Sequence, residues 1–91
     1  MKVRLTLRAR EDLDGIVGYL RGRSPTGARN VRQAIRTSLD LIGRFPDLGR
    51  SSGEAGTRVL PVGRYPYLIY WLVLNGEVRI AHIRHAARER P

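Results

Sequence analysis

The most constraining feature of this 91-residue chain is the apolar run from Tyr65 to Leu74, which ends directly before Asn75-Gly76. Alternate residues of a strand point to opposite faces of its sheet, and here both sets are apolar. This pattern predicts a central strand that is covered on both sides. Because Asn-Gly favours a tight type I′ turn, the chain is predicted to return as an adjacent antiparallel strand from Glu77 to about Ile83.

The N-terminal part of the chain changes its apolar period from two to that of a helix. Residues Lys2 to Leu7 alternate charged or polar with apolar side chains, as a half-buried strand does. From Ala9 onward a helical stripe follows, and Ser24-Pro25 then marks the start of a second helix, with serine as the N-cap and proline in the first turn. Phe45-Pro46 ends this helix, because the residue before proline is pushed out of the helical region. The first stripe consists of Leu13, Ile16, Val17 and Leu20.

The remaining segments complete a small α+β domain. Pro46 to Thr57 reads as a loop, and Arg58 to Val62 as a short strand that Pro61 places at or near an edge of the sheet. The order is therefore β-α-α-β-β-β: a helical hairpin packed on one face of a mostly antiparallel sheet with three to four strands. A chain of this length cannot bury a second core, so residues 1–91 are predicted to form a single domain.

Charge is the first indication of function. The chain has 17 lysine and arginine residues against 8 acidic ones, a net charge of +9, and every basic residue except Lys2 is arginine. Such an excess points to a polyanionic partner, either nucleic acid or an acidic protein surface, although charge can also serve solubility alone. The chain has no cysteine, no signal-peptide pattern at its N-terminus, and no apolar run long enough to span a membrane. We therefore expect a cytoplasmic protein.

Several segments, in order and across nearly the whole chain, together form a known pattern: Arg4-Leu5-Thr6, Ala9, Asp12-Leu13, Ile16, Tyr19-Leu20, Phe45 to Arg50, Arg58 to Tyr70 and Ile83 to Arg88. These segments resemble the RelE/ParE superfamily of toxins, and they are closer to ParE than to RelE. This resemblance implies the toxin of a bacterial type II toxin–antitoxin system, whose ParE-like members inhibit DNA gyrase. It also implies an acidic antitoxin, typically a ParD-like ribbon-helix-helix protein, that wraps the toxin in a hetero-oligomer.

An alternative function is ribosome-dependent cleavage of mRNA, as in RelE-like relatives. Cleavage through a 2′-hydroxyl needs a base, an acid and cations on the phosphate. Here His85 is the fallback base or acid, with Arg58 and Arg88 as phosphate clamps. The chain has only one lysine, however, and no aromatic residue follows His85. No catalytic residue is therefore expected, and neither a cofactor nor a metal is implied, because no acidic or histidine cluster has ligand spacing.

Binding residues are predicted in two groups. A positively charged group is expected to contact the target, with the tail from Arg84 to Pro91 as its most exposed part. An apolar group on the aromatic strand and the first helix is expected to receive the antitoxin. A nucleic-acid-binding domain without toxicity is a third possibility. The target group consists of Arg58, Arg64, Arg84, His85, Arg88 and Arg90, and the antitoxin group of Tyr65, Tyr67, Ile69, Trp71, Leu13, Ile16 and Leu20.

Overall fold

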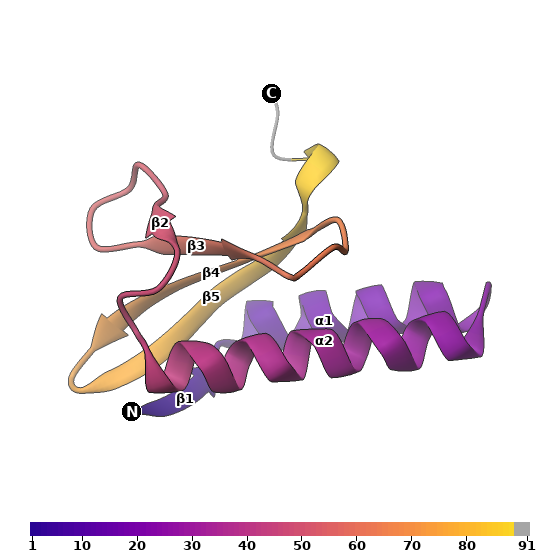
Figure 1. Ribbon diagram of the computed structural model, residues 1–91, viewed down its shortest axis with the longest axis horizontal. Helices are drawn as coiled ribbons and strands as arrows, with labels where there is room; N and C mark the ends of the chain where they lie inside the picture. Colours follow the sequence, from indigo (N-terminus) through magenta and orange to yellow (C-terminus); the bar gives the residue numbers. More distant parts are fainter. Residues whose placement is uncertain (89–91) are drawn as a thin grey trace.

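Two helices lie on one face of a five-stranded sheet in the computed structural model, which describes residues 1–88 (Figure 1). The predicted α+β class, with a helical hairpin on a mostly antiparallel sheet, is confirmed. The elements in chain order are β1 (Lys2–Leu5), α1 (Leu7–Arg21), α2 (Pro25–Arg44), β2 (Arg50–Ser51), β3 (Arg58–Pro61), β4 (Tyr67–Leu74), β5 (Glu77–His85) and the 3-10 turn η1 (Ala86–Arg88).

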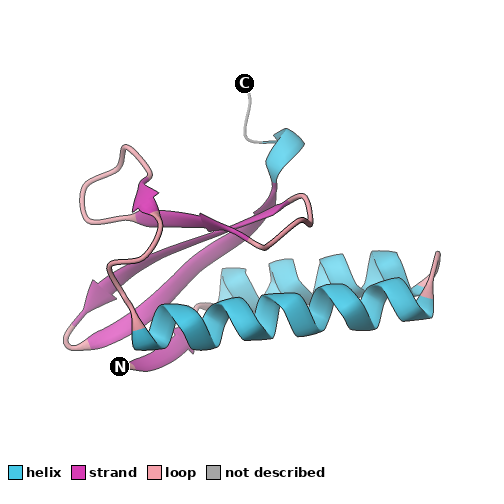
Figure 2. Cartoon of the chain, in the orientation of Figure 1, coloured by secondary structure: helices cyan, strands magenta, loops and turns pink. Residues whose placement is uncertain are grey.

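The sheet has the strand order β1-β5-β4-β3-β2, with β1 parallel to β5 and the other pairs antiparallel. The expected count of three to four strands was wrong, because β2 lies inside the segment predicted as a loop (Figure 2). β2 pairs Arg50 with Val59 and Ser51 with Arg58, and so covers only the first half of β3. Pro61 therefore lies at an open edge, as its missing N–H requires.

The first strand is shorter than predicted because Thr6 is the N-cap of α1. Its Oγ1 accepts a hydrogen bond from the Ala9 N–H at 3.1 Å and donates to the Ile80 carbonyl at 2.8 Å. The side chain thus caps the helix and fastens it to β5. Leu7 is consequently the first helical residue and is 74% exposed, so its apparent place in the period-two pattern was misleading.

The predicted limits of the second helix and of the hairpin turn are confirmed. Ser24 Oγ accepts a hydrogen bond from the Gly27 N–H at 3.0 Å, Pro25 occupies the first turn, and Phe45 is the C-cap. Asn75 and Gly76 both have positive φ, 52° and 74°, as a type I′ turn requires. α2 therefore presents its apolar stripe to the sheet, and β4 and β5 form its central pair.

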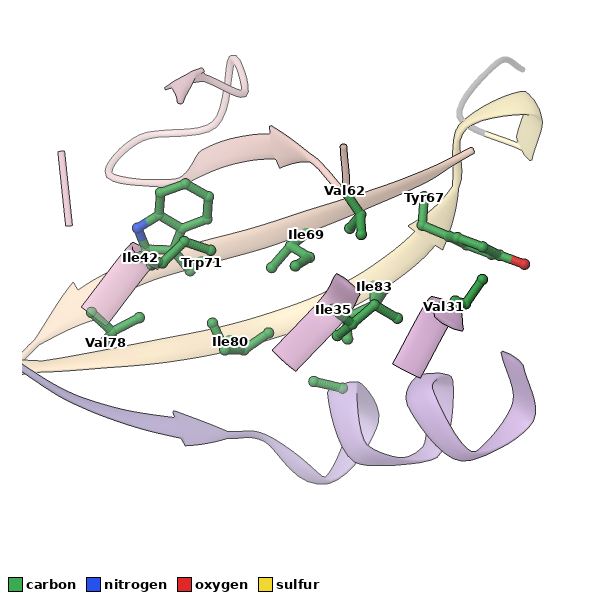
Figure 3. Close-up of a cluster of buried hydrophobic side chains, with 11 residues drawn as sticks. Val31, Ile35, Ile42, Val62, Tyr67, Ile69, Trp71, Val78, Ile80 and Ile83 are labelled. Carbon is green, nitrogen blue, oxygen red and sulfur yellow. The ribbon is translucent and has the colours of Figure 1, made fainter. Parts of the chain in front are cut away.

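The core lies between the helices and the inner face of β4 and β5 (Figure 3). Ile69 pairs with Ile83, and Trp71 with Ile80, and all four side chains are buried. The indole N–H of Trp71 donates to the Pro46 carbonyl at 3.1 Å, which satisfies its one polar group. Burial of these large side chains against α2 provides the main stabilisation of the fold.

The outer face of β4 is less covered than predicted. Tyr70 is buried and stacks on the His82 ring at 4.3 Å, but Leu68 and Leu72 are only half-buried and Leu74 is 46% exposed. Both helices lie on the opposite side of the sheet, and no helix covers this face anywhere in residues 1–88 (Figure 1). The expected cover on both sides is therefore corrected to a helical layer on one side only.

Candidate partner-binding groove

The helical hairpin extends beyond the end of the sheet (Figure 1). An open groove lies at this end of the molecule. The groove has a volume of about 990 Å³ and lies between the distal half of the hairpin and the segment where β4 begins and β5 ends. We call it the hairpin groove. Its apolar and aromatic lining includes Ile16, Tyr19 and Leu20 of α1, Val31 of α2, Tyr65 and Pro66 just before β4, Tyr67 at the start of β4, and Ile83 of β5.

The lining of the hairpin groove continues the core. The apolar stripe of α1 reaches Leu20, which packs against the core and also lines the hairpin groove. Figure 3 shows Tyr67 at this end of the core, beside Val31, with its hydroxyl pointing away from the sheet. The hydrophobic surface of the hairpin is therefore longer than the sheet that packs on it, and the excess is open to a partner.

One wall of the hairpin groove is held by Asp12, which the sequence analysis did not select as a site residue. Its Oδ2 accepts a hydrogen bond from the backbone N–H of Ile83 at 2.9 Å. β1 ends at Leu5, so this N–H lies on a part of the β5 edge that no strand covers. Asp12 thus satisfies the open edge and fixes α1 against β5. Asp12 lies four and seven residues before Ile16 and Tyr19, on the same flank of the helix, and this spacing could have predicted that it belongs to the groove.

His85 lies at the rim of the hairpin groove. Its Nδ1 accepts a hydrogen bond from the Ala87 N–H at 3.2 Å, and its ring meets Tyr67 edge-on with 5.5 Å between centroids. In the neutral imidazole the proton is consequently on Nε2. These contacts tie η1 to the end of the sheet, which is a structural role for the histidine.

Arg58 lies away from His85, so the fallback catalytic set is not assembled. In the β-sheet register Arg58 is opposite Trp71, whereas His85 is opposite Tyr67, four residues earlier on β4 and thus about 13 Å away. The Arg58 guanidinium donates to the carbonyls of Leu48 and Gly49, at 2.9 and 3.1 Å. It fastens the loop before β2 and lines a smaller pocket of about 280 Å³ beside Trp71, which His85 does not line.

Three other residues of the predicted target group, Arg64, Arg84 and Arg88, belong to segments that border the start of β4 or the end of β5. Arg64 is exposed, with its guanidinium 5.8 Å from the centre of the Tyr65 ring. Arg84 is a half-buried residue of β5 that lines the hairpin groove, so the tail begins at Ala86 and not at Arg84 as expected. Arg88 is the last residue of η1, and Arg90 lies outside the described residues.

The predicted antitoxin group divides between the groove and the core. Ile16, Leu20, Tyr65 and Tyr67 line the hairpin groove, and Leu13 is half-buried against the core. Ile69 and Trp71 have no exposed surface, which corrects the expectation that they belong to a docking face. Their side of β4 is the side that the helices cover.

The described part of the chain offers neither a cluster of metal ligands nor a membrane-spanning helix. Within residues 1–88, no three histidine or acidic side chains come together as ligands for a metal ion. In the same residues, neither helix is long and apolar enough to cross a bilayer. The hairpin groove is therefore the principal candidate site.

Comparison with known proteins identifies the family. The family model for the ParE toxin of the type II toxin–antitoxin system parDE matches residues 3–90. Toxin RelE2 of Caulobacter vibrioides is 35% identical over 83 residues, which is 91% of this chain and 92% of the relative. Toxin RelE3 of the same organism is 32% identical, over 97% of each chain.

A solved structure agrees with these sequences. The chain resembles a structure described as the chromosomal ParDE toxin–antitoxin system from P. aeruginosa, with a TM-score of 0.84 and 26% identity over 93% of this chain and 95% of that one. The chain therefore belongs to the ParE toxin family of type II toxin–antitoxin systems, within the wider group of RelE/ParE-type toxins.

Proposed function

We propose that this toxin acts by binding DNA gyrase, without bond chemistry of its own, and that an acidic antitoxin neutralises it in the cytoplasm. The observation that carries the proposal is the hairpin groove, which is apolar along its floor and has Arg84 and His85 at its rim. An amphipathic antitoxin segment fits such a site, because its apolar face covers the floor while a carboxylate meets Arg84, away from Glu11 and Asp12 of α1, which also line the groove. The name of the structural relative, a ParDE system, supports an antitoxin partner.

The arrangement also suggests how neutralisation works. Four residues of the predicted antitoxin group and two of the predicted target group, Arg84 and His85, border the same groove. A segment bound in the groove would cover these two residues and stand beside η1, which begins directly after His85. We propose that the antitoxin prevents target binding by occupying this common surface.

The tail beyond β5 provides the direct test of target binding. Deletion of residues 86–91 removes η1 and the basic end but keeps β5, whereas a cut after Ile83 would also remove the strand residues Arg84 and His85. We expect the deleted chain to lose growth inhibition and inhibition of gyrase supercoiling in vitro, because the predicted target group loses Arg88 and Arg90 with this segment. Its melting temperature should stay close to that of the full chain.

A charge-matched control separates the tail from net charge. The deletion removes two arginines and one glutamate, and Arg50→Gln likewise removes one positive charge, from β2, away from the end of β5 (Figure 1). Arg50→Gln should keep full toxicity. A fully toxic deletion would remove the tail from the proposed mechanism. Cuts in ribosome-bound mRNA with supercoiling unaffected would instead establish the RelE-like alternative.

A further inference from the structure

A row of arginines follows one exposed flank of α2. This helix has four arginines and a single acidic residue, Asp40, which lies one turn after Arg36. Arg29, Arg32 and Arg36 are separated by three and four residues, so they lie on the same side of the helix, and all three are exposed. We call them the arginine row; it spans about 10 Å of helix.

The charges of the arginine row are not neutralised within the described chain. The ion pairs among residues 1–88 both belong to Glu77, which binds Arg4 and Arg79 on the far side of the sheet from the helices. The guanidinium of Arg29 donates only to the neutral Thr26 hydroxyl, at 3.3 Å. Like charges at this helical spacing repel one another, so the row costs stability unless a polyanion compensates it.

The neighbours of the arginine row indicate what kind of polyanion fits. The residues beside it on the exposed side of α2 are Thr26, Gln33, Thr37 and the acidic Asp40, without an aromatic or large apolar side chain. A protein interface needs an apolar core, and single-stranded nucleic acid needs aromatic rings for stacking. A phosphate backbone needs only cations and hydrogen-bond donors such as hydroxyl and amide groups.

We propose that the arginine row is a contact surface for the phosphate backbone of duplex DNA. Recognition of an RNA duplex depends on 2′-hydroxyl contacts across two separated minor grooves, which one short row on a single helix does not supply. The row lies on a different flank of α2 from Val31, Asn30 and Gly27, which line the hairpin groove. DNA binding is therefore compatible with an occupied groove, and it is an activity in addition to the proposed function.

The salt dependence of binding tests this proposal quantitatively. We would compare the wild type with R29Q/R32Q/R36Q, using fluorescence anisotropy of a labelled duplex of about 20 base pairs between about 50 and 200 mM salt. The slope of log K against log salt is negative, and the loss of three phosphate contacts should make its magnitude smaller by about 2.7. Glutamine is a good helix former, so α2 should remain folded, which circular dichroism verifies.

A matched variant, K2Q/R8Q/R50Q, removes the same charge from three exposed residues on β1, α1 and β2. Its slope should change by less than about 1, because these residues do not form a common surface. Equal losses in the two variants would overturn the proposal, since net charge alone would then explain binding. The proposal would also be overturned if R29Q/R32Q/R36Q lost affinity for poly-glutamate but not for duplex DNA. The same holds if the wild type bound a duplex RNA of the same length more tightly than the DNA.

Discussion

Single residues secure the junctions on which the site depends, and Gly49 is the clearest case. It has a φ of +77°, and a Cβ there would collide with the Val59 carbonyl and lie 3.0 Å from the Trp71 ring. The glycine therefore lets the loop before β2 pass close to β3 and the indole, where the Arg58 guanidinium holds it. Close backbone approach and left-handed φ are both required at this position.

Substitution of Gly49 by alanine should be far more costly than the same change at Gly53. Gly53 also has positive φ, +96°, but an added Cβ would meet nothing within 4 Å. We expect Gly53→Ala to lower the free energy of unfolding by about 1 kcal/mol, from backbone strain alone. Gly49→Ala should lower it by about 3 kcal/mol or more, because overpacking is added. Urea denaturation measures both, and equal losses would contradict the close approach.

At the scale of elements, the parallel pair β1 and β5 is joined by a charged contact. The Glu77 carboxylate accepts from Arg4 Nε at 3.2 Å and meets Arg79 Nη2 at 3.4 Å. The hydrogen bond from Arg4 is the main reason that the pKa of Glu77 lies below its ordinary value of 4.5, and the positive charges of Arg4 and Arg79 act in the same direction. The carboxylate thus favours the folded state when it is ionised.

This contact predicts a pH dependence of stability. Because the pKa of Glu77 is lower in the folded chain than in the unfolded one, its contribution is complete above the unfolded value and is lost as the pH falls through the folded value. Glu77→Gln should therefore melt at a lower temperature than the wild type at pH 7, and the difference should shrink in acid. Glu54→Gln, in an exposed loop, is the control, and it should change neither the melting temperature at pH 7 nor its dependence on pH. A pH-independent difference for Glu77→Gln would contradict the electrostatic origin.

At the scale of the whole molecule, the mismatch in length between hairpin and sheet creates the hairpin groove. The distal half of the hairpin keeps its apolar stripe where β4 and β5 have ended (Figure 1). Asp12, in the preceding part of α1, fixes the helix to β5 through the Ile83 N–H, so the hairpin groove is formed before any partner arrives. A preformed groove reduces the ordering cost of binding for the toxin.

The hairpin groove can be tested with one substitution at two positions of α1. Leu20→Asp places a charge on the apolar floor, and Leu7→Asp places it at the start of the helix, where the side chain is 74% exposed and outside the groove. We expect Leu20→Asp to weaken antitoxin binding by about 30-fold or more, and Leu7→Asp to leave it unchanged. Calorimetric titration measures both, with thermal melting as the folding check. Wild-type affinity in a folded Leu20→Asp chain would exclude the groove as the antitoxin site.

The sequence by itself determined the local elements of this protein. Ser24-Pro25 and Phe45-Pro46 mark the limits of α2, and Asn75-Gly76 the turn between β4 and β5, because capping and turn geometry depend on adjacent residues. The family resemblance and the positive charge were also readable there. Four of the apolar residues predicted to bind the antitoxin do meet in one groove.

Only the tertiary structure decided which surfaces are open. The alternation of β4 separates its two faces but does not say which one the helices cover, so Ile69 and Trp71 were placed on the wrong surface. β2, the anchoring of Arg58 and the contact between Asp12 and Ile83 all join residues that are distant in sequence. Such pairings follow from the packing of the whole chain, since a local pattern records the period of an element but not its neighbours.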